Sequence, residues 1–507
     1  MKRRTVVKGL TATATATATV VPVVGLAASS ARAASGTAKK AAADSSLVFD
    51  PSAYTEQTIT ITDTTGTARS VTYRFFKVAS YVASPVNAAY QSLNVSVPVA
   101  IDGAAVDASD APVLLANAIG GYMPSSVANA TGISASGMGG GTSRQALALA
   151  AGYVVVEPGA RGRTLVDANG VYYGTAPAAI VDLKAAVRYL KSNRGRVPGN
   201  VDRIVSSGVS AGGALSALLG ASGDSPLYEP YLEEIGAADA SDAIFASGDW
   251  CPITDLEHAD AAYEWNWGAN HLASGATVDA TISADLRAQY TDYLASLKLR
   301  ARGYGTLTTR NLDTYILETF IQPSATKYLS ALSDTARSAY LAAHPFLTWS
   351  AGKATFTWAD FLTHVGARRK NAPSFDAFDM STPECNLYGT GTTRARHFTL
   401  YSLRHEAGDS ARLDADIPAK LQLMNPMYHL VDKVNPHRAK HWWIRVGTKD
   451  TDTSHSVVAN LATRLTDLGD DVNTAYYWDA GHGADLDPGD FIAWIGKVSG
   501  HRKRNKR

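Results

Sequence analysis

The sequence predicts an α/β protein with a doubly wound, mainly parallel β-sheet and a large, mostly helical insertion. Near-continuous apolar runs alternate with segments in which apolar residues recur every three to four positions. The runs are typical of strands covered on both faces, and the spaced pattern is typical of helices with one buried side. The alternation stops from about Pro252 to Arg396 and then resumes, which predicts an insertion within one sheet.

The first part of the sheet is expected to begin with an antiparallel hairpin. Residues 57–76, QTITITDTTGTARSVTYRFF, alternate between apolar and polar on both sides of a Thr-Gly pair, and LNVSVPVAI at 93–101 extends the pattern. APVLLANAI at 111–119 and GYVVVEPG at 152–159 are near-continuous apolar runs, which predict parallel strands. A helical stripe over residues 180–190 predicts a helix that covers them.

The remaining strands and helices are predicted from the same two patterns. In chain order they are strand DRIVSSG (202–208), helix ALSALLGAS (214–222), strand AIFASGDW (243–250), strand HWWIRVG (441–447), the helix bearing Val457, Leu461, Leu465 and Leu468, strand VNTAYYW (472–478) and a helix near DFIAWIGKV (490–498).

The first 33 residues have the pattern of an export signal. Arg3 and Arg4 are followed by a low-charge run from Gly9 to Ser30 and by the small-residue cleavage site Ala31-Arg32-Ala33. The arginine pair and the weakly apolar run resemble a twin-arginine signal. A membrane anchor is the alternative, but Pro22 and many threonines weaken a lipid-facing helix. We therefore expect an exported protein with no membrane partner in its mature form.

Composition excludes several other classes of function. Removal of residues 1–33 leaves 42 Lys and Arg against 46 Asp and Glu, so no nucleic-acid partner is expected. No phosphate-binding loop, zinc-protease motif or complete dinucleotide fingerprint occurs, so we expect neither metal nor cofactor. The two cysteines, Cys251 and Cys385, are too few for a disulfide scaffold and are expected to be buried free thiols, with one disulfide as the alternative.

The stretch GVSAGG, residues 208–213, carries the first chemical signal. Its glycines flank Ser210 in the Gly-x-Ser-x-Gly pattern of a nucleophile elbow, where a strand turns sharply into a helix. A side chain at Gly208 or Gly212 would collide with a neighbouring strand or helix, and the serine itself is expected in a strained conformation. Because the motif lies between a predicted strand and a predicted helix, it indicates an α/β-hydrolase fold with a serine nucleophile.

Such a serine needs a base and an orienting carboxylate, which follow it in the order acid, then histidine. His482 in DAGHG directly follows a predicted strand, whereas its competitors, His455 and His501, lie at a helix start and in the tail. The loop RVGTKDTDTS supplies Asp450 and Asp452 as candidate acids. Spacing does not choose between them, and Asp452 could instead cap the following helix.

The oxyanion hole is expected to use two backbone N–H groups. One belongs to Ala211, directly after the serine, and the other to the loop IGGYM that follows the strand VLLANA. The glycine pair Gly120 and Gly121 would let the substrate approach the backbone closely, and we place the second donor at Gly121. Ordinary tight-turn glycines are the alternative.

Seven motifs occur in an order that resembles the bacterial tannases, α/β-hydrolase esterases that act on galloyl esters. In chain order they are GARGR (159–163), GVSAGG, GDWCPITDL, RRKNAPSFD, NLYGT, GTKDTDTS and AGHG. The resemblance covers most of the chain from about Ser46. Fungal tannases and related feruloyl esterases often join cysteines next to the serine and histidine, whereas Val209 and Gly481 stand there in this chain, which favours the bacterial branch.

The resemblance also implies roles for individual residues. It implies that Ser210 is the nucleophile, Asp450 the acid and His482 the base, and that Lys370, Glu384 and Asp452 hold the three ring hydroxyls. Carboxylates and an ammonium group suit this task because each phenol is both a donor and an acceptor. Lys370 and Glu384 fall in the insertion, which would therefore close over the ester.

The sequence thus predicts an exported serine esterase that cleaves small phenolic galloyl esters through an acyl-enzyme. A feruloyl or broad-specificity carboxylesterase with the same triad is the alternative, a peptidase is less favoured, and a non-catalytic binding protein is the third hypothesis. The predicted organisation is an export signal (1–33), a linker (34–45), a catalytic domain (46–252 and 397–500), an inserted lid and substrate-binding domain (253–396) and a basic tail (501–507).

Overall fold

The structure is a computed structural model that describes residues 47–137 and 141–501. These residues belong to one compact unit. The predicted export signal and linker, and the tail beyond His501, lie outside the described residues. Among the described residues, no helix combines the length and the apolar character needed to cross a membrane.

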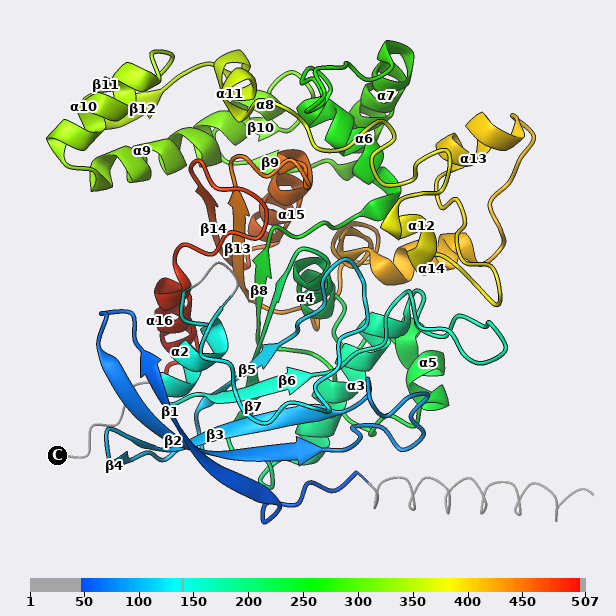
Figure 1. The fold of residues 1–507 in the computed structure, drawn as a ribbon. Helices are drawn as coiled ribbons and strands as arrows, with labels where there is room; N and C mark the ends of the chain where they lie inside the picture. The colour runs from blue at the N-terminus through cyan, green and yellow to red at the C-terminus, as the bar shows by residue number, and fades with distance from the viewer. Residues whose placement is uncertain (1–46, 138–140, 502–507) are drawn as a thin grey trace, which may run out of the picture. The chain divides into compact units, whose positions relative to one another are not determined.

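A ten-stranded sheet forms the centre of the fold (Figure 1). Its order is β1-β2-β3-β6-β5-β7-β8-β13-β14, and β4 pairs with β3. The strands are β1 (Tyr54–Thr62), β2 (Ala68–Val78), β3 (Leu93–Ile101), β4 (Ala104–Ala105), β5 (Pro112–Ala116), β6 (Val154–Pro158), β7 (Asn200–Val209), β8 (Ala246–Trp250), β13 (His441–Gly447) and β14 (Asp471–Tyr477).

The two parts of this sheet differ in strand direction, as the hydrophobic patterns predicted. Strands β1 and β2 form the expected antiparallel hairpin, with Tyr54 opposite Phe76, and their residues alternate between exposed and more buried positions. From β6 to β14 every neighbouring pair is parallel. Strands β5 and β8 are buried along their whole length, which explains their apolar and small residues; the exception is Asp249 of β8, which accepts a hydrogen bond from Ser247.

Helices cover both faces of the sheet, so the doubly wound arrangement is confirmed. Helix α4 (Ala211–Ala221) lies on one face, where the Ser247 hydroxyl of β8 donates to the carbonyl oxygen of Ser216 at 2.9 Å. Helix α16 (Pro488–Val498) lies on the other face, where Phe491 packs edge-on against Trp250 of β8. Ser247 and Trp250 are three residues apart and therefore point to opposite sides of the strand.

The other covering helices pack beside these two. Helix α3 (Ala178–Ser192) contacts α4, α2 (Arg144–Ala150) contacts α16, and α15 (His455–Asp467) lies against β13 and β14. The short helix α5 (Glu229–Glu234) contacts α3 and follows the 3₁₀ turn η1 (Pro226–Tyr228).

The segment between β8 and β13 contributes no strand to the main sheet among the described residues. It holds two small hairpins, β9–β10 (Arg300–Ala301, Gly305–Thr306) and β11–β12 (Thr348–Ser350, Lys353–Thr355). Its helices are α6 (Leu256–Trp267), α7 (Ala280–Leu297), α8 (Leu312–Ile316), η2 (Leu317–Ile321), α9 (Gln322–Ala331), α10 (Asp334–Ala343), α11 (Trp358–Val365), α12 (Pro383–Leu387), α13 (Leu400–Ala407), α14 (Ile417–Met424) and η3 (Tyr428–Asp432). The insertion is therefore mostly helical, while the domain boundaries at 253 and 396 stay predictions.

A buried ion cluster fixes α3 to the chain that leads into β8. Lys184 Nζ lies 2.7 Å from Asp242 Oδ1, and Arg188 Nε lies 2.9 Å from Asp242 Oδ2. The side chains of Lys184 and Asp242 are both fully buried. Lys184 also donates to the carbonyl oxygen of Ser222 at the C-terminal end of α4, so one ammonium group joins α3, the end of α4 and the chain that leads into β8.

We expect Lys184→Met to lower the free energy of unfolding by about 3–5 kcal/mol, because it leaves a buried carboxylate with one partner fewer. Urea unfolding followed by tryptophan fluorescence measures this change. Lys327→Ala, at an exposed lysine of α9, is the control and should stay within about 0.5 kcal/mol of the wild type. Equal stability of Lys184→Met and the wild type would contradict the assigned role.

Candidate active site

Ser210 lies at the junction of β7 and α4, in the conformation that a nucleophile elbow requires. Its φ of 60° and ψ of −122° lie outside the regions that residues with side chains favour. Two backbone bonds support this strain: the Ser210 N–H donates to the carbonyl oxygen of Trp250, and the Ser210 carbonyl oxygen accepts from Ala214, both at 2.9 Å. The serine is thereby held at the carboxyl edge of the sheet.

The glycines around it are required by close packing, as predicted. A Cβ added to Gly208 would lie 2.1 Å from the carbonyl oxygen of Gly212, and one added to Gly212 would lie 2.5 Å from Asn117 Oδ1. Sequence reasoning missed a third, Gly213, whose added Cβ would lie 2.4 Å from the carbonyl oxygen of Trp250. All three close approaches let α4 start directly at the strand end.

The structure brings together the three side chains predicted as a triad. His482 Nε2 lies 2.9 Å from Ser210 Oγ. On the other side of the ring, His482 Nδ1 lies 3.0 Å from Asp450 Oδ1 and 2.9 Å from Asp450 Oδ2. The Asp450 side chain is fully buried, and that of His482 is 25% exposed. This is the hydroxyl–imidazole–carboxylate arrangement that activates a serine.

The geometry also separates the candidates that spacing left open. Asp450 faces the imidazole, whereas Asp452 Oδ2 lies 3.0 Å from Arg369 Nη1. The competing His455 is fully buried with Nε2 near the carbonyl oxygen of Thr448, and His501 stacks edge-on against Tyr153. Neither competing histidine is the ring that contacts the serine.

Charge at the imidazole is set mainly by two opposing effects. Burial is the largest single effect and lowers the pKa of His482, but the hydrogen bonds and charge interactions with Asp450 and Cys251 together outweigh burial and raise the pKa above its ordinary value. The buried thiol of Cys251 lies beside both groups: its sulfur, an Asp450 oxygen and a His482 nitrogen all lie within 4.8 Å of one another. Both cysteines are free and buried, as predicted, but sequence reasoning missed this position of Cys251.

Among the residues that the structure describes, two groups of side chains place several possible metal ligands close together. The first is Cys251 with the Asp450–His482 pair. The second is Asp376, Cys385 and His397. There the Asp376 carboxylate accepts His397 Nδ1 at 2.7 Å and two backbone N–H groups, so its oxygens are satisfied by the protein. Through Asp376, this second group of side chains holds α12, which contains Cys385, against the segment of His397.

The predicted oxyanion donors lie at the elbow and in the loop after β5. Ala211 is the first residue of α4, where backbone N–H groups have no acceptor within the helix. Gly121 has a φ of 53°, and a Cβ added to it or to Gly120 would meet nothing within 4 Å, so the pair borders open space. Sequence reasoning missed Arg163, which fixes this loop: its N–H donates to Tyr122 O at 2.9 Å and its Nε to Gly121 O at 2.8 Å.

The residues predicted to hold ring hydroxyls share one electrostatic neighbourhood. Glu384, in α12, is 7% exposed, and its Oε2 has no hydrogen-bond partner among the described residues. Burial raises the pKa of Glu384, Lys370 and Arg163 oppose this rise, and Asp452 adds to it. Lys370 Nζ lies 3.7 Å from the ring centre of Phe375. A buried carboxylate oxygen without a donor is unfavourable, which makes it a binding group for a donor on a ligand.

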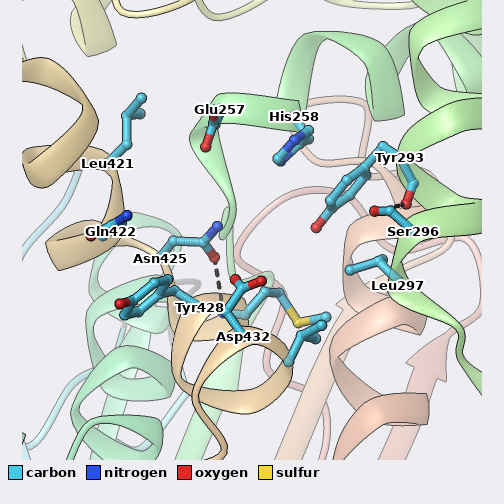
Figure 2. A pocket seen from close by; sticks show the side chains of 12 residues that line it. Glu257, His258, Tyr293, Ser296, Leu297, Leu421, Gln422, Asn425, Tyr428 and Asp432 are labelled. Atoms are coloured by element: carbon cyan, nitrogen blue, oxygen red, sulfur yellow. Dashed lines mark hydrogen bonds between the residues drawn. The ribbon is translucent and has the colours of Figure 1, made fainter.

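A cavity of about 450 Å³ lies elsewhere, among helices of the segment between β8 and β13 (Figure 2). It is lined by Glu257, His258, Tyr293, Ser296, Leu297, Leu421, Gln422, Asn425, Met427, Tyr428, Val431 and Asp432. Its serine, Ser296, donates its hydroxyl to the carbonyl oxygen of Tyr293 at 2.7 Å instead of to a base. None of the predicted site residues lines this cavity, so the chemistry belongs to the elbow.

Comparisons with known proteins agree with this site. A family model described as BD-FAE, an α/β-hydrolase family, matches residues 130–289. A search of curated proteins found no match. The crystal structure of Fusobacterium nucleatum tannase is 37% identical, with a TM-score of 0.78, and the alignment covers 89% of this chain and 99% of that one.

Two structures of a tannin acyl hydrolase, one in complex with ethyl gallate and one with 3,4-dihydroxybenzoate, are similar to the same degree. Each is 35% identical with a TM-score of 0.78, and each alignment covers 89% of this chain and 99% of the other. The predicted α/β-hydrolase fold is thereby confirmed. Identity at this level over nearly the whole of the compared structures shows that the chain belongs to the tannase family of carboxylic ester hydrolases.

Proposed function

We propose that this enzyme hydrolyses galloyl esters through a covalent acyl-enzyme on Ser210. The observation that carries the proposal is the continuous pair of hydrogen bonds from Ser210 Oγ through the His482 ring to Asp450. A related tannin acyl hydrolase is known in complex with ethyl gallate, a galloyl ester. This family member supports the substrate class.

Each step of the reaction uses groups of this chain. His482 Nε2 takes the proton of Ser210 Oγ as that oxygen bonds to the ester carbonyl carbon. The Ala211 and Gly121 N–H groups stabilise the negative oxygen of the tetrahedral intermediate. His482 then gives the proton to the alcohol oxygen as the ester bond breaks. In the second half, His482 takes a proton from water, the hydroxide attacks the acyl carbon, and Ser210 Oγ regains the proton as the acid leaves.

Selectivity for the galloyl ring is assigned to Glu384, Lys370 and Asp452. The unpartnered Glu384 Oε2 would accept a phenol hydroxyl, and the charges of Lys370 and Asp452 act on the same carboxylate. A ring without hydroxyls would leave the Glu384 carboxylate desolvated and unpaired, which disfavours the binding of such a ring. The feruloyl and broad carboxylesterase alternatives share the triad and differ in this part of the site.

Ser210→Ala is expected to lower kcat for methyl gallate by about 10⁴- to 10⁶-fold, because it removes the nucleophile. Initial rates and labelling by a fluorophosphonate probe measure this loss, while circular dichroism checks the fold. Ser52→Ala, at an exposed loop serine, should keep full activity. Turnover in Ser210→Ala at the wild-type rate would remove Ser210 from the mechanism, and a folded wild type that the probe does not label would favour a binding protein.

Glu384→Gln is expected to lower kcat/KM for methyl gallate by about 10- to 100-fold, because a charge-assisted hydrogen bond to the ring is lost. The rate for methyl benzoate, which lacks ring hydroxyls, should not fall. Glu56→Gln on the exposed strand β1 is the control. If the wild type cleaves methyl ferulate or a short acyl ester better than methyl gallate, the galloyl assignment is wrong and an alternative esterase takes its place.

Export through a twin-arginine-type signal is also part of the proposal. It rests on Arg3, Arg4 and the cleavage site at 31–33. We expect the protein recovered from the medium of a host with an active twin-arginine pathway to begin at Ala34, as read by intact mass spectrometry. Retention of the full chain inside such a host would contradict it.

A further inference from the structure

Asp479 begins the loop that carries the catalytic imidazole. It follows β14 by two residues, precedes His482 by three, and has a φ of 59°. Aspartate is among the side chains that tolerate this left-handed region best. Its backbone N–H donates to Thr448 Oγ1 at 2.9 Å, so the loop is fastened at its first residue to the loop of the triad acid.

The Asp479 carboxylate contacts two further segments, helices α10 and α11, and also Lys449 in the loop of the triad acid. Oδ1 lies 2.6 Å from His364 Nε2 of α11 and 3.0 Å from Lys449 Nζ. Oδ2 accepts the hydroxyl of Tyr340 from α10. Burial raises the pKa of Asp479, but hydrogen bonds from His364, Tyr340 and Lys449 outweigh burial and hold the pKa well below its ordinary value. The group is therefore an anion at neutral pH, with donors on several sides.

One of these partners, Lys449, directly precedes the triad acid. Its backbone N–H donates to the carbonyl oxygen of Ala480 at 2.9 Å. A Cβ added to Gly447 would lie only 2.2 Å from the same carbonyl oxygen. The loops of residues 447–450 and 479–482 are thus in direct backbone contact, and the distance between Asp450 and His482 depends on how they are held together.

The other partners connect this pair of loops to the insertion. The His364 ring stacks on Trp478 with ring centres 5.0 Å apart and planes 7° apart, and Trp478 Nε1 donates to the Tyr340 hydroxyl at 2.7 Å. Figure 1 shows α10 and α11 beyond the ends of β13 and β14, the strands that lead into the two loops. Helices of the insertion therefore contact the base-bearing loop directly.

We propose that Asp479 is a positioning residue that holds His482 against Asp450 and couples this placement to helices α10 and α11. The inference rests on the proposed role of Ser210, His482 and Asp450 but not on the galloyl substrate. An imidazole displaced by about 1 Å loses much of its effect as a base, and a carboxylate with donors from several segments limits such displacement. The insertion then contributes to nucleophile activation as well as to substrate binding.

The test removes the negative charge of Asp479, or one of its hydrogen-bond donors, with substitutions that keep side chains of similar size. Asp479→Asn keeps a side chain that tolerates the positive φ, Tyr340→Phe keeps the ring, and His364→Phe keeps an aromatic surface against Trp478. We expect each to slow fluorophosphonate labelling of Ser210 and to lower kcat for methyl gallate by the same factor, about 3- to 30-fold, with KM within twofold of the wild type. Asp479→Asn combined with Tyr340→Phe should lose less than the product of the single effects, because both variants affect the same hydrogen bond between Tyr340 and Asp479.

Tyr328→Phe is the matched control, since the Tyr328 ring packs against Tyr340 and belongs to the same aromatic cluster. It should label at the wild-type rate. Wild-type labelling rates in Asp479→Asn, Tyr340→Phe and His364→Phe would overturn the inference. The inference would also be overturned if thermal melts showed that the lower labelling rate comes from a smaller folded fraction. A rise in KM with unchanged kcat would overturn it as well. If methyl gallate is not a substrate, labelling rates still decide the role of Asp479, so the two proposals fail separately.

Discussion

The hydrogen bond between the buried Asp450 carboxylate and His482 Nδ1 is the interaction on which the site depends. Without it the imidazole would lose its fixed orientation and the largest of the effects that raise its pKa, and Ser210 would lack a correctly oriented base. The fold makes this bond possible through strand register. β13 and β14 are parallel, and Gly447 pairs with Tyr477, so the loops that follow leave the same edge side by side.

The serine reaches that edge through the same register. Val209 pairs with Trp250, and Trp250 pairs with Arg445 of β13, so three neighbouring parallel strands end near one level. A slip of one residue would turn side chains to the opposite face. The buried central strands fix the register because both of their faces must be covered. The core of the sheet is therefore also what brings together three residues that lie far apart in the chain.

Sequence reasoning predicted those parts of the molecule that depend on local pattern. The runs at 93–101 and 441–447 coincide with β3 and β13, because burial on a sheet leaves a local hydrophobic signature. Helix α2 was missed because its seven residues, mostly alanine and leucine, form no one-sided stripe. Spacing left the choice between Asp450 and Asp452 open because both lie in one loop; the family resemblance favoured Asp450, and in the structure His482 lies beside Asp450. Arg163, Cys251 and Asp479 lie within motifs that the sequence analysis quoted, but their contacts come from distant segments, and no local pattern could reveal those contacts.

Under the proposed function, the insertion would link substrate recognition to the catalytic groups by two separate routes. On one side, Arg163 fixes the loop of Gly121 through a backbone carbonyl and donates from Nη1 to Asn386 Oδ1, two residues after Glu384. On the other, α10 and α11 hold the loop of His482. The buried Glu384 Oε2 has no hydrogen-bond partner among the described residues, which is energetically unfavourable in the free protein. A phenol hydroxyl that donates to this oxygen would remove the unfavourable free energy. Arg163 contacts both the loop of Gly121 and Asn386, two residues after Glu384. A substrate ring that donates a hydrogen bond to Glu384 would thus favour the arrangement in which the oxyanion donors are held in place. Substrate affinity and the rate of ester cleavage would then depend on the same contacts.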